Sequence, residues 1–450
     1  MRLRFLSLFL CTSFALATLT LASIANGAGL LLTAADDSEI TALKAARLLD
    51  VKSGKIVSNP IVLVSKGIIT ELGQKVAIPL GAKQIDLGDV TLMPGMIDAH
   101  THLLQNLSFE TSARIRESGS MVHTLSTMSD AKRALLGATM AREDLMSGIT
   151  TVRDLGNSGT NADVDLRDAI NQSWIQGPRM LVSTRALAPI GGQFNKLTKE
   201  THALIDKEYA VISGPEEARK AVRSAIFDGA DVIKVIVDAE SRLLTLEELQ
   251  MIVNEAHRVG IKVAAHAGTE PAGMLAAQAG VDSIEHGYGI SDELLKLMAK
   301  KNIAMVATDF PAWYYLGKSS EKEISESDQK RLTMFKYGEQ FALERIGRAK
   351  AAGVRIVLGS DSYYQAGNLT RGQSSLLPLR VYALAGLSPA EVIRTVTIHA
   401  AELLGWGEKI GSLEKSKIAD IIAVPGNPLD NLLVIEQVKF VMKDGVVVKP

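Results

Sequence analysis

Cysteine is nearly absent from this 450-residue chain, which contains a single one, Cys11. One cysteine cannot form a disulfide within the chain, so no disulfide framework stabilises the fold. Neither sign of charge is in large excess, because 49 lysines and arginines face 50 aspartates and glutamates. This balance excludes a broad basic field, and we therefore expect no nucleic-acid partner.

The first 27 residues have the composition of a secretory signal peptide. Arg2 and Arg4 form a basic start, an apolar stretch covers residues 5–22, and the small residues Ala25 and Gly27 follow. This pattern predicts cleavage after Gly27 and a secreted or periplasmic protein with no membrane contact afterwards. An uncleaved membrane anchor is the alternative, because the apolar stretch comes near the length needed to span a bilayer.

Both ends of the remaining chain are rich in short apolar runs separated by turns. Residues 40–90 contain the turn sequences Lys-Ser-Gly and Ser-Lys-Gly, and residues 419–450 contain Pro-Gly and Asp-Gly. Such punctuation is typical of hairpins. We expect one small β-sandwich domain built from residues 28–92 and 406–450.

The middle of the chain, residues 93–405, alternates strand-like and helix-like segments. The expected strands cover residues 95–102, 149–155, 180–187, 231–237, 262–267, 283–286, 304–309 and 355–360. The expected helices between and after them include residues 131–148, 245–260, 291–302 and 388–405. Eight such units predict an α/β fold, a (β/α)8 TIM-like barrel. A doubly wound open sheet is the alternative, but no GxGxxG follows a strand to support it.

His100 and His102 are two residues apart at the end of the first expected strand. Alternate side chains of a strand share one face, so both imidazoles should point into the barrel, with Asp98 deeper on the same face. Paired imidazoles suit a divalent cation such as Zn²⁺.

Lys234 lies inside the apolar run Val-Ile-Lys-Val-Ile-Val. An unpaired ammonium there would cost several kcal/mol in lost hydration. Either a carboxylate such as Asp238 neutralises it, or CO₂ carboxylates the amine. The resulting anion, an N6-carboxylysine, could lie between two metal ions and reduce their repulsion.

Three further polar side chains end later strands: His266, His286 and Asp361. Two histidines on successive strands, downstream of the first pair, favour a metal site over ordinary packing. Asp361 can bind a metal and also accept a proton, so it is the expected catalytic residue.

Several motifs of the chain resemble the amidohydrolase superfamily. They are PGMIDAHTHL, TTVRDLG, VAAHAG, SIEHG, GSD and, near the C-terminus, KSKIADIIAVPGNPLDNL. Within that superfamily the chain is most similar to the imidazolonepropionase-like group and its Xaa-Pro dipeptidase (prolidase-type) members. The resemblance implies two divalent metal ions. His100, His102 and Asp361 would hold one, His266 and His286 the other, and carboxylated Lys234 would bridge them.

The implied activity is cleavage of an amide or peptide bond, in Xaa-Pro-like dipeptides or N-acyl amino acids, by a hydroxide that bridges the metals. Arg153, Arg185 and His123 are candidates to bind a substrate carboxylate. Tyr288 closely follows His286 and should line the pocket.

Two other functions remain open. The same site would serve a hydrolase of cyclic amides, lactones or phosphotriesters, and a non-catalytic periplasmic binding protein could carry the same ligands. The sequence leaves a homo-oligomer possible.

Overall fold

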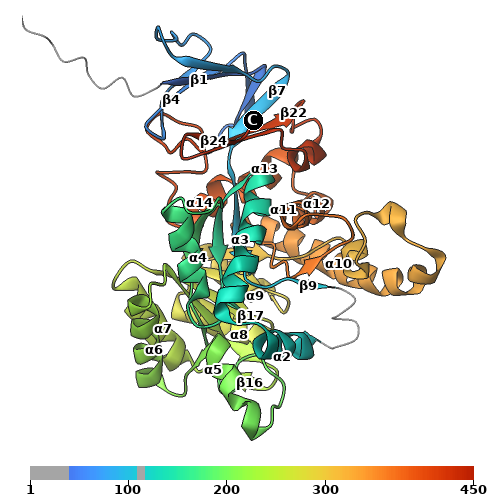
Figure 1. The fold of residues 1–450 in the computed structure, drawn as a ribbon. Coiled ribbons are helices and arrows are strands. Elements are labelled where there is room, and N and C mark those ends of the chain that lie inside the picture. The colour runs from blue at the N-terminus through green and yellow to red at the C-terminus, as the bar shows by residue number, and fades with distance from the viewer. Residues whose placement is uncertain (1–39, 109–116) are drawn as a thin grey trace, which may run out of the picture. The chain divides into compact units, whose positions relative to one another are not determined.

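The computed structural model describes residues 40–108 and 117–450 (Figure 1). The expected signal peptide, residues 1–27, lies outside the described residues. Within the described part of the chain, no helix combines the length and the apolar character needed to cross a membrane.

The middle of the chain contains two sheets of parallel strands. The first has the order β11-β10-β8 and the second the order β13-β12-β14-β17-β18-β19-β20. Their bounds are β8 (Met96–Thr101), β10 (Ile149–Asp154), β11 (Arg179–Val182), β12 (Ala186–Ala188), β13 (Tyr209–Val211), β14 (Val232–Ile236), β17 (Lys262–Ala267), β18 (Ser283–His286), β19 (Ala304–Ala307) and β20 (Ile356–Leu358). Strands run in all eight expected places. The segment 180–187 divides into β11 and β12, and Thr184 between them has φ 58°.

Main-chain hydrogen bonds connect both edge strands of the three-stranded sheet, β8 and β11, to the seven-stranded sheet. The Asp361 N–H, just after β20, donates to the His100 carbonyl of β8 at 2.8 Å. The Asp231 N–H, just before β14, donates to the Val182 carbonyl of β11 at 2.8 Å. These contacts bring the ends of β8 and β20 together, although they are far apart in sequence.

Helices alternate with the parallel strands (Figure 1). The α-helices are α2 (Glu117–Thr127), α3 (Asp130–Met146), α4 (Ala162–Asn171), α5 (Ile205–Glu208), α6 (Pro215–Phe227), α7 (Leu246–His257), α8 (Glu270–Ala279), α9 (Asp292–Lys301), α10 (Gln329–Ala351), α11 (Arg371–Ser375), α12 (Pro378–Leu384), α13 (Pro389–Thr395) and α14 (Ile398–Leu403). The 3₁₀ turns are η1 (Lys199–Leu204), η2 (Ala312–Leu316), η3 (Glu321–Glu323), η4 (Glu326–Asp328) and η5 (Leu432–Glu436). Two small pairs complete this part: β9 (Leu107–Ser108) with β21 (Tyr364–Gln365), and β15 (Asp238–Ala239) with β16 (Arg242–Leu243).

Local sequence signals account for several of these helix ends, since Ser or Thr side chains cap the N-termini of α3, α7, α9, α11 and α13. A capping box is present at Thr245, because its hydroxyl accepts from the Glu248 N–H while the Glu248 carboxylate accepts from the Thr245 N–H. The segment 388–405, expected as one helix, is instead divided into α13 and α14. The break follows from tertiary pairing: the Val396 carbonyl accepts a hydrogen bond from the Ile97 N–H of β8 rather than continuing the helix.

Strands from both ends of the chain form two further sheets. Their orders are β5-β4-β1-β6 and β24-β23-β22-β7-β2-β3. The bounds are β1 (Thr41–Lys44), β2 (Arg47–Asp50), β3 (Lys55–Ser58), β4 (Ile61–Ser65), β5 (Ile68–Gly73), β6 (Lys83–Asp86), β7 (Val90–Pro94), β22 (Ile421–Pro425), β23 (Phe440–Lys443) and β24 (Val446–Lys449). Antiparallel pairing of β7 with β22 joins the N-terminal and C-terminal strands in one sheet. Buried side chains of both sheets, among them Leu43 and Phe440, form one apolar cluster.

Candidate metal centre

His100 in β8 and His102 just after it present the same ring nitrogen, Nε2, toward Asp361. His100 Nδ1 lies 2.8 Å from the Glu285 carboxylate, and His102 Nδ1 lies 2.7 Å from the Gly156 carbonyl. A carbonyl oxygen can only accept, so His102 Nδ1 carries the proton, and the carboxylate favours the same tautomer in His100. Both rings therefore keep an Nε2 lone pair free for a ligand, which is the arrangement typical of metal-binding histidines.

Lys234 of β14 faces these rings. Its Nζ lies 3.3 Å from His100 Nε2, and its side chain is buried. Among the described residues, no carboxylate oxygen approaches Lys234 Nζ to within 4.0 Å. Burial lowers the pKa of Lys234 to about 8, against the opposing effect of the Glu285 and Asp361 charges. A buried amine that loses its proton this easily is chemically suited to react with CO₂.

The structure corrects one alternative for Lys234. Asp238 is bound elsewhere, since its carboxylate accepts from the Gly268 N–H at 2.9 Å and from the Thr269 N–H at 3.0 Å and hydroxyl at 2.7 Å. These three bonds turn the carboxylate toward the start of α8. Asp238 is therefore not the partner that neutralises Lys234.

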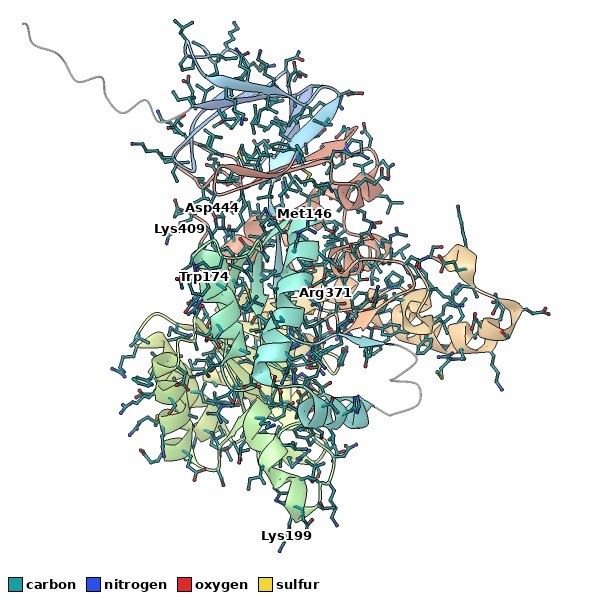
Figure 2. The ribbon with its side chains drawn as sticks, viewed as in Figure 1. Met146, Trp174, Lys199, Arg371, Lys409 and Asp444 are labelled. Carbon is teal, nitrogen blue, oxygen red and sulfur yellow. The ribbon has the colours of Figure 1, made fainter. Side chains whose placement is uncertain are left out.

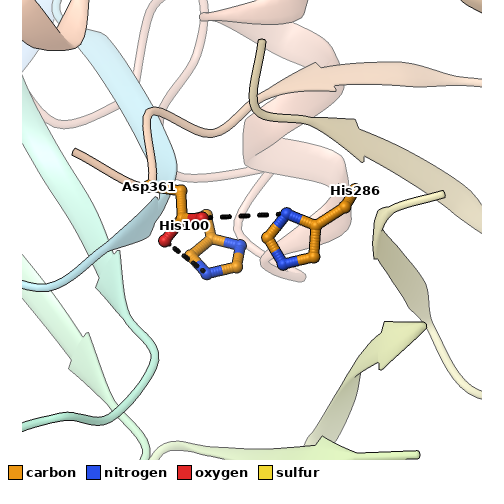
Figure 3. Close-up of side chains that lie close together, drawn as sticks. All are labelled: His100, His286 and Asp361. Atoms are coloured by element: carbon orange, nitrogen blue, oxygen red, sulfur yellow. Dashed lines mark ion pairs between the residues drawn. The ribbon is translucent and has the colours of Figure 1, made fainter. Parts of the chain in front are cut away.

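Asp361 follows β20 and stands among the imidazoles (Figure 3). Its Oδ1 lies 3.1 Å from His102 Nε2 and 3.5 Å from His100 Nε2, while its Oδ2 lies 3.7 Å from His286 Nδ1. Burial alone would raise the pKa of Asp361, but the surrounding imidazoles hold it well below its usual range. The carboxylate is thus ionised at neutral pH and available as a ligand.

Two of the converging residues have a strained backbone. Asp361 has φ 48° and His286 has φ 67°, in the left-handed region that residues with a side chain rarely adopt. Each costs of order 1–3 kcal/mol, and such positions concentrate at functional sites. Both side chains lie beside His100, with Asp361 Oδ1 3.5 Å from His100 Nε2 and the His286 ring centroid 5.2 Å from that of His100.

The ligating atoms of His100, His286 and Asp361 all lie within 4.8 Å of one another, which makes them a possible His/Asp metal site. His266 is next to this group, with its ring centroid 4.7 Å from that of His286. Burial and the nearby Lys234 charge lower the pKa of His100 and of His266 to about 4. Both imidazoles are therefore neutral at pH 7, the form that binds metal ions.

These side chains lie at one cavity of about 410 Å³. Tyr363 stacks on His102 with ring centroids 4.5 Å apart, and its hydroxyl donates to Asn157 Oδ1 at 2.6 Å. Tyr288 stacks on His286 with centroids 5.3 Å apart. The wall also includes Met121, Gln193, Phe194, Asn195, Tyr209 and Tyr364. The pocket therefore combines a polar floor with aromatic walls, as expected of a small-molecule site.

Residues 91–449 match the model of the amidohydrolase family. The chain belongs to this family. Ochratoxinase of Aspergillus niger is 28% identical over 92% of this chain and 86% of its own. Imidazolonepropionase of Fusobacterium nucleatum is 26% identical over 81% of this chain and 85% of its own.

Two solved structures of similar proteins also cover nearly all of this amidohydrolase. A Xaa-Pro dipeptidase with bound methionine in its active site is 27% identical, with a TM-score of 0.76, over 92% of this chain and 100% of its own. A prolidase complexed with N-methylphosphonate-L-proline is 26% identical, with a TM-score of 0.77, over 91% and 99%. The family and these hydrolases assign the chain to the hydrolases that act on C–N bonds.

Three residues predicted to bind a substrate carboxylate do not line the cavity of this amidohydrolase: Arg153, Arg185 and His123. Arg153 is buried and donates to the Ala99 carbonyl at 2.6 Å, the Ser283 hydroxyl at 3.1 Å and Glu285 at 2.8 Å. Arg185 donates to the Asp206 carbonyl at 2.9 Å, and His123 is exposed on α2. Tyr288, in contrast to these three residues, does line the cavity.

Arg153 instead stabilises the candidate metal centre indirectly, through Glu285. It fixes one oxygen of Glu285, whose other oxygen holds His100 Nδ1. Although burial alone would raise the pKa of Glu285, Arg153 and His100 hold it well below its usual range. Arg371 supports the other histidine, because its Nη1 donates to the His102 carbonyl at 3.4 Å; its place on α11 is labelled in Figure 2.

Sequence reasoning missed Asn157, Gln193 and Tyr209 as parts of the cavity wall. Asn157 has φ 56°, and Gln193 lies in an irregular stretch after β12, so neither belongs to a periodic pattern. The Tyr209 hydroxyl donates to Gln193 Oε1 at 3.2 Å, which joins the two only in space. No spacing in the chain signals these contacts.

Proposed function

We propose that this amidohydrolase binds two divalent metal ions and uses them to hydrolyse amide or peptide bonds of small substrates. The single observation that carries the proposal is the distance of 3.3 Å between Lys234 Nζ and His100 Nε2, because His100 belongs to the possible metal site that it forms with His286 and Asp361. A free ammonium there would be buried, and among the described residues no carboxylate oxygen lies within 4.0 Å of it to offset its charge. A carboxylated amine would fit, because it adds negative charge where metal ions need it.

The donor set fits such ions. His100, His102 and Asp361 would hold one ion, His266 and His286 the other, and Lys234 as N6-carboxylysine would bind both. A ligand set of neutral imidazoles with a few carboxylate oxygens favours Zn²⁺ among the common divalent ions. When bound, the ions would supply an acidified water molecule and would polarise the substrate carbonyl.

The protein's own residues would do the remaining chemistry. Asp361 is ionised and 3.1 Å from His102 Nε2, so its carboxylate can take a proton from water and deliver it to the leaving nitrogen. Glu285 and the Gly156 carbonyl would hold the imidazoles of His100 and His102 in the tautomer required. Tyr288 and Tyr363 would pack against the substrate from either side of the histidines.

The proposed substrates are Xaa-Pro-like dipeptides and N-acyl amino acids. The Xaa-Pro dipeptidase, the prolidase and the ochratoxinase among the similar proteins support this choice. A cavity of about 410 Å³ with aromatic walls has room for a substrate of this size. A cyclic amide is the second candidate, favoured by the relatives named imidazolonepropionase.

A substrate panel tests the proposal. The purified chain, loaded with Zn²⁺ in the presence of bicarbonate, is assayed with dipeptides, N-acyl amino acids, cyclic amides, lactones and a phosphotriester. We expect turnover of the first two classes, and loss of that turnover after chelation. Turnover confined to cyclic substrates would favour the second candidate, and no turnover with any would overturn the hydrolase mechanism.

Two structural proposals accompany this function. We infer that the parallel strands of residues 93–405 close into a (β/α)8 barrel, supported by the hydrogen bond from the Asp361 N–H to the His100 carbonyl. We also infer that residues 28–92 and 406–450 form a β-sandwich, supported by the pairing of β7 with β22. A crystal structure would test both.

We propose export of the protein on the basis of residues 1–27 alone. N-terminal sequencing of the protein recovered from the periplasm or medium should begin at residue 28. An intact N-terminus in the membrane fraction would favour the anchor instead.

A further inference from the structure

Helix α10 has two unlike faces. Its inner face carries buried side chains, including Leu332, Ala342 and Ile346. On the opposite face lie exposed side chains spaced four, three, four and three residues apart: Lys330, Met334, Tyr337, Phe341 and Glu344. We call these five residues the α10 stripe.

The centre of the α10 stripe is apolar and open to solvent. Met334 is 61% exposed, Tyr337 76% and Phe341 51%. Single exposed apolar residues are ordinary, but a contiguous row of three large ones marks an interaction surface. Their spacing is that of the seam through which two helices pack side by side.

The charges at the two ends of the α10 stripe indicate what covers it. Lys330 and Arg331 lie at the N-terminal end, and Glu344 lies at the C-terminal end. In an antiparallel pair, Lys330 of each copy would lie next to the partner's Glu344, so the interface would contain this charge pair two times. A parallel pair would instead place like charges together. The macrodipoles of the helices also favour the antiparallel arrangement.

The middle of α10 also has room for a second helix. Gly338 follows Tyr337, and a Cβ added at Gly338 would meet no atom within 4 Å. In an antiparallel pair centred here, the partner's Tyr337 would lie over this glycine, where no side chain blocks it. Met334 would then lie next to the partner's Phe341.

We propose that the α10 stripe is a homodimer interface, in which α10 packs antiparallel against α10 of a second copy of this chain. The self-complementary order of cation, apolar centre and anion carries this inference. A twofold interface requires one surface to match itself, and the α10 stripe does so in one orientation only.

Cysteine cross-linking tests the arrangement directly, because Cys11 is the only cysteine of the chain. In a full-length Cys11→Ser background, Tyr337→Cys should form a disulfide-linked dimer on mild oxidation, because this position lies near the twofold axis. Met334→Cys alone should not, whereas a mixture of Met334→Cys and Phe341→Cys chains should give the mixed dimer. Phe227→Cys, on α6 and 90% exposed, is the matched control and should remain monomeric. Efficient self-linking through Met334→Cys would indicate a parallel pair and would overturn the proposal.

Light scattering after size-exclusion chromatography gives an independent test. The wild type should show a dimer that dissociates on dilution, and Tyr337→Glu should raise the dimer Kd at least tenfold, while Phe227→Glu should not. Lys330→Glu should weaken the dimer, and the double variant Lys330→Glu/Glu344→Lys should restore it. Near-UV circular dichroism would verify that each variant is folded. A monomeric wild type at every concentration, or a dimer that Tyr337→Glu leaves intact, would overturn the proposal.

Discussion

Lys234 Nζ lies 3.3 Å from His100 Nε2, although the two residues come from different strands and are 134 positions apart. Both side chains are buried, and among the described residues no carboxylate oxygen lies within 4.0 Å of the amine. A cation in this position destabilises the metal-free protein. Under the proposed function, carboxylation of the amine would replace this cation with an anion that could bind the metal ions.

The metal-free protein should therefore gain stability at alkaline pH. Lys234 has a pKa of about 8 in the folded chain and about 10.4 when unfolded, so the unfolded chain binds more protons between these values. The free energy of unfolding should rise as pH increases through this window, by up to about 3 kcal/mol. Urea unfolding of the chelated protein at several pH values would measure it. Lys234→Met should remove this rise, and an identical rise in that variant would assign it to another group.

Glu285→Gln should destabilise the protein strongly. This change leaves the buried Arg153 without its counter-charge, and breaking one side of a buried pair costs about 3–5 kcal/mol. It also weakens the hold on His100 Nδ1, so metal affinity should fall roughly 10- to 100-fold. Denaturant midpoints and metal titration would measure the two effects. Glu216→Gln, at an exposed ion pair with Arg219 on α6, is the control, and an equal loss of stability there would remove Glu285 from this role.

Asp361→Asn should reduce turnover by roughly 10²- to 10⁴-fold, because the amide cannot take a proton from water. The hydrogen bond from the Asp361 N–H to the His100 carbonyl does not depend on the side chain, so the fold should persist. Steady-state kinetics with metal analysis of the same sample would separate loss of proton transfer from loss of metal. Unchanged turnover would exclude Asp361 as the proton acceptor.

The walls of the cavity should determine substrate affinity, whereas the residues first expected to bind a carboxylate should not. Tyr288→Ala removes a ring that stacks on His286 and should raise KM up to about tenfold. Arg185→Ala and His123→Ala should leave KM within about twofold, since neither residue lines the cavity. A larger effect of Arg185 than of Tyr288 would contradict this assignment.

The strand ends and the polar side chains that meet there could be predicted because period and residue type agree at these positions. His100, Lys234 and Asp361 each end or interrupt an apolar run, and parallel strands bring such positions to one edge. Arg153 could not be assigned correctly, because a strand position does not reveal that Glu285 and two other acceptors satisfy its side chain. The break of an expected strand at Thr184 and of an expected helix at Val396 likewise could not be predicted. At Val396 the reason is a hydrogen bond from a distant strand.

The most direct test of the account is a count of metal ions per chain, combined with ¹³C NMR of protein prepared with labelled bicarbonate. The wild type should bind two divalent ions and show a carbamate carbon signal. Lys234→Met should lose that signal together with at least one ion. Two ions bound equally well by Lys234→Met, or a wild type with no carbamate signal, would contradict it.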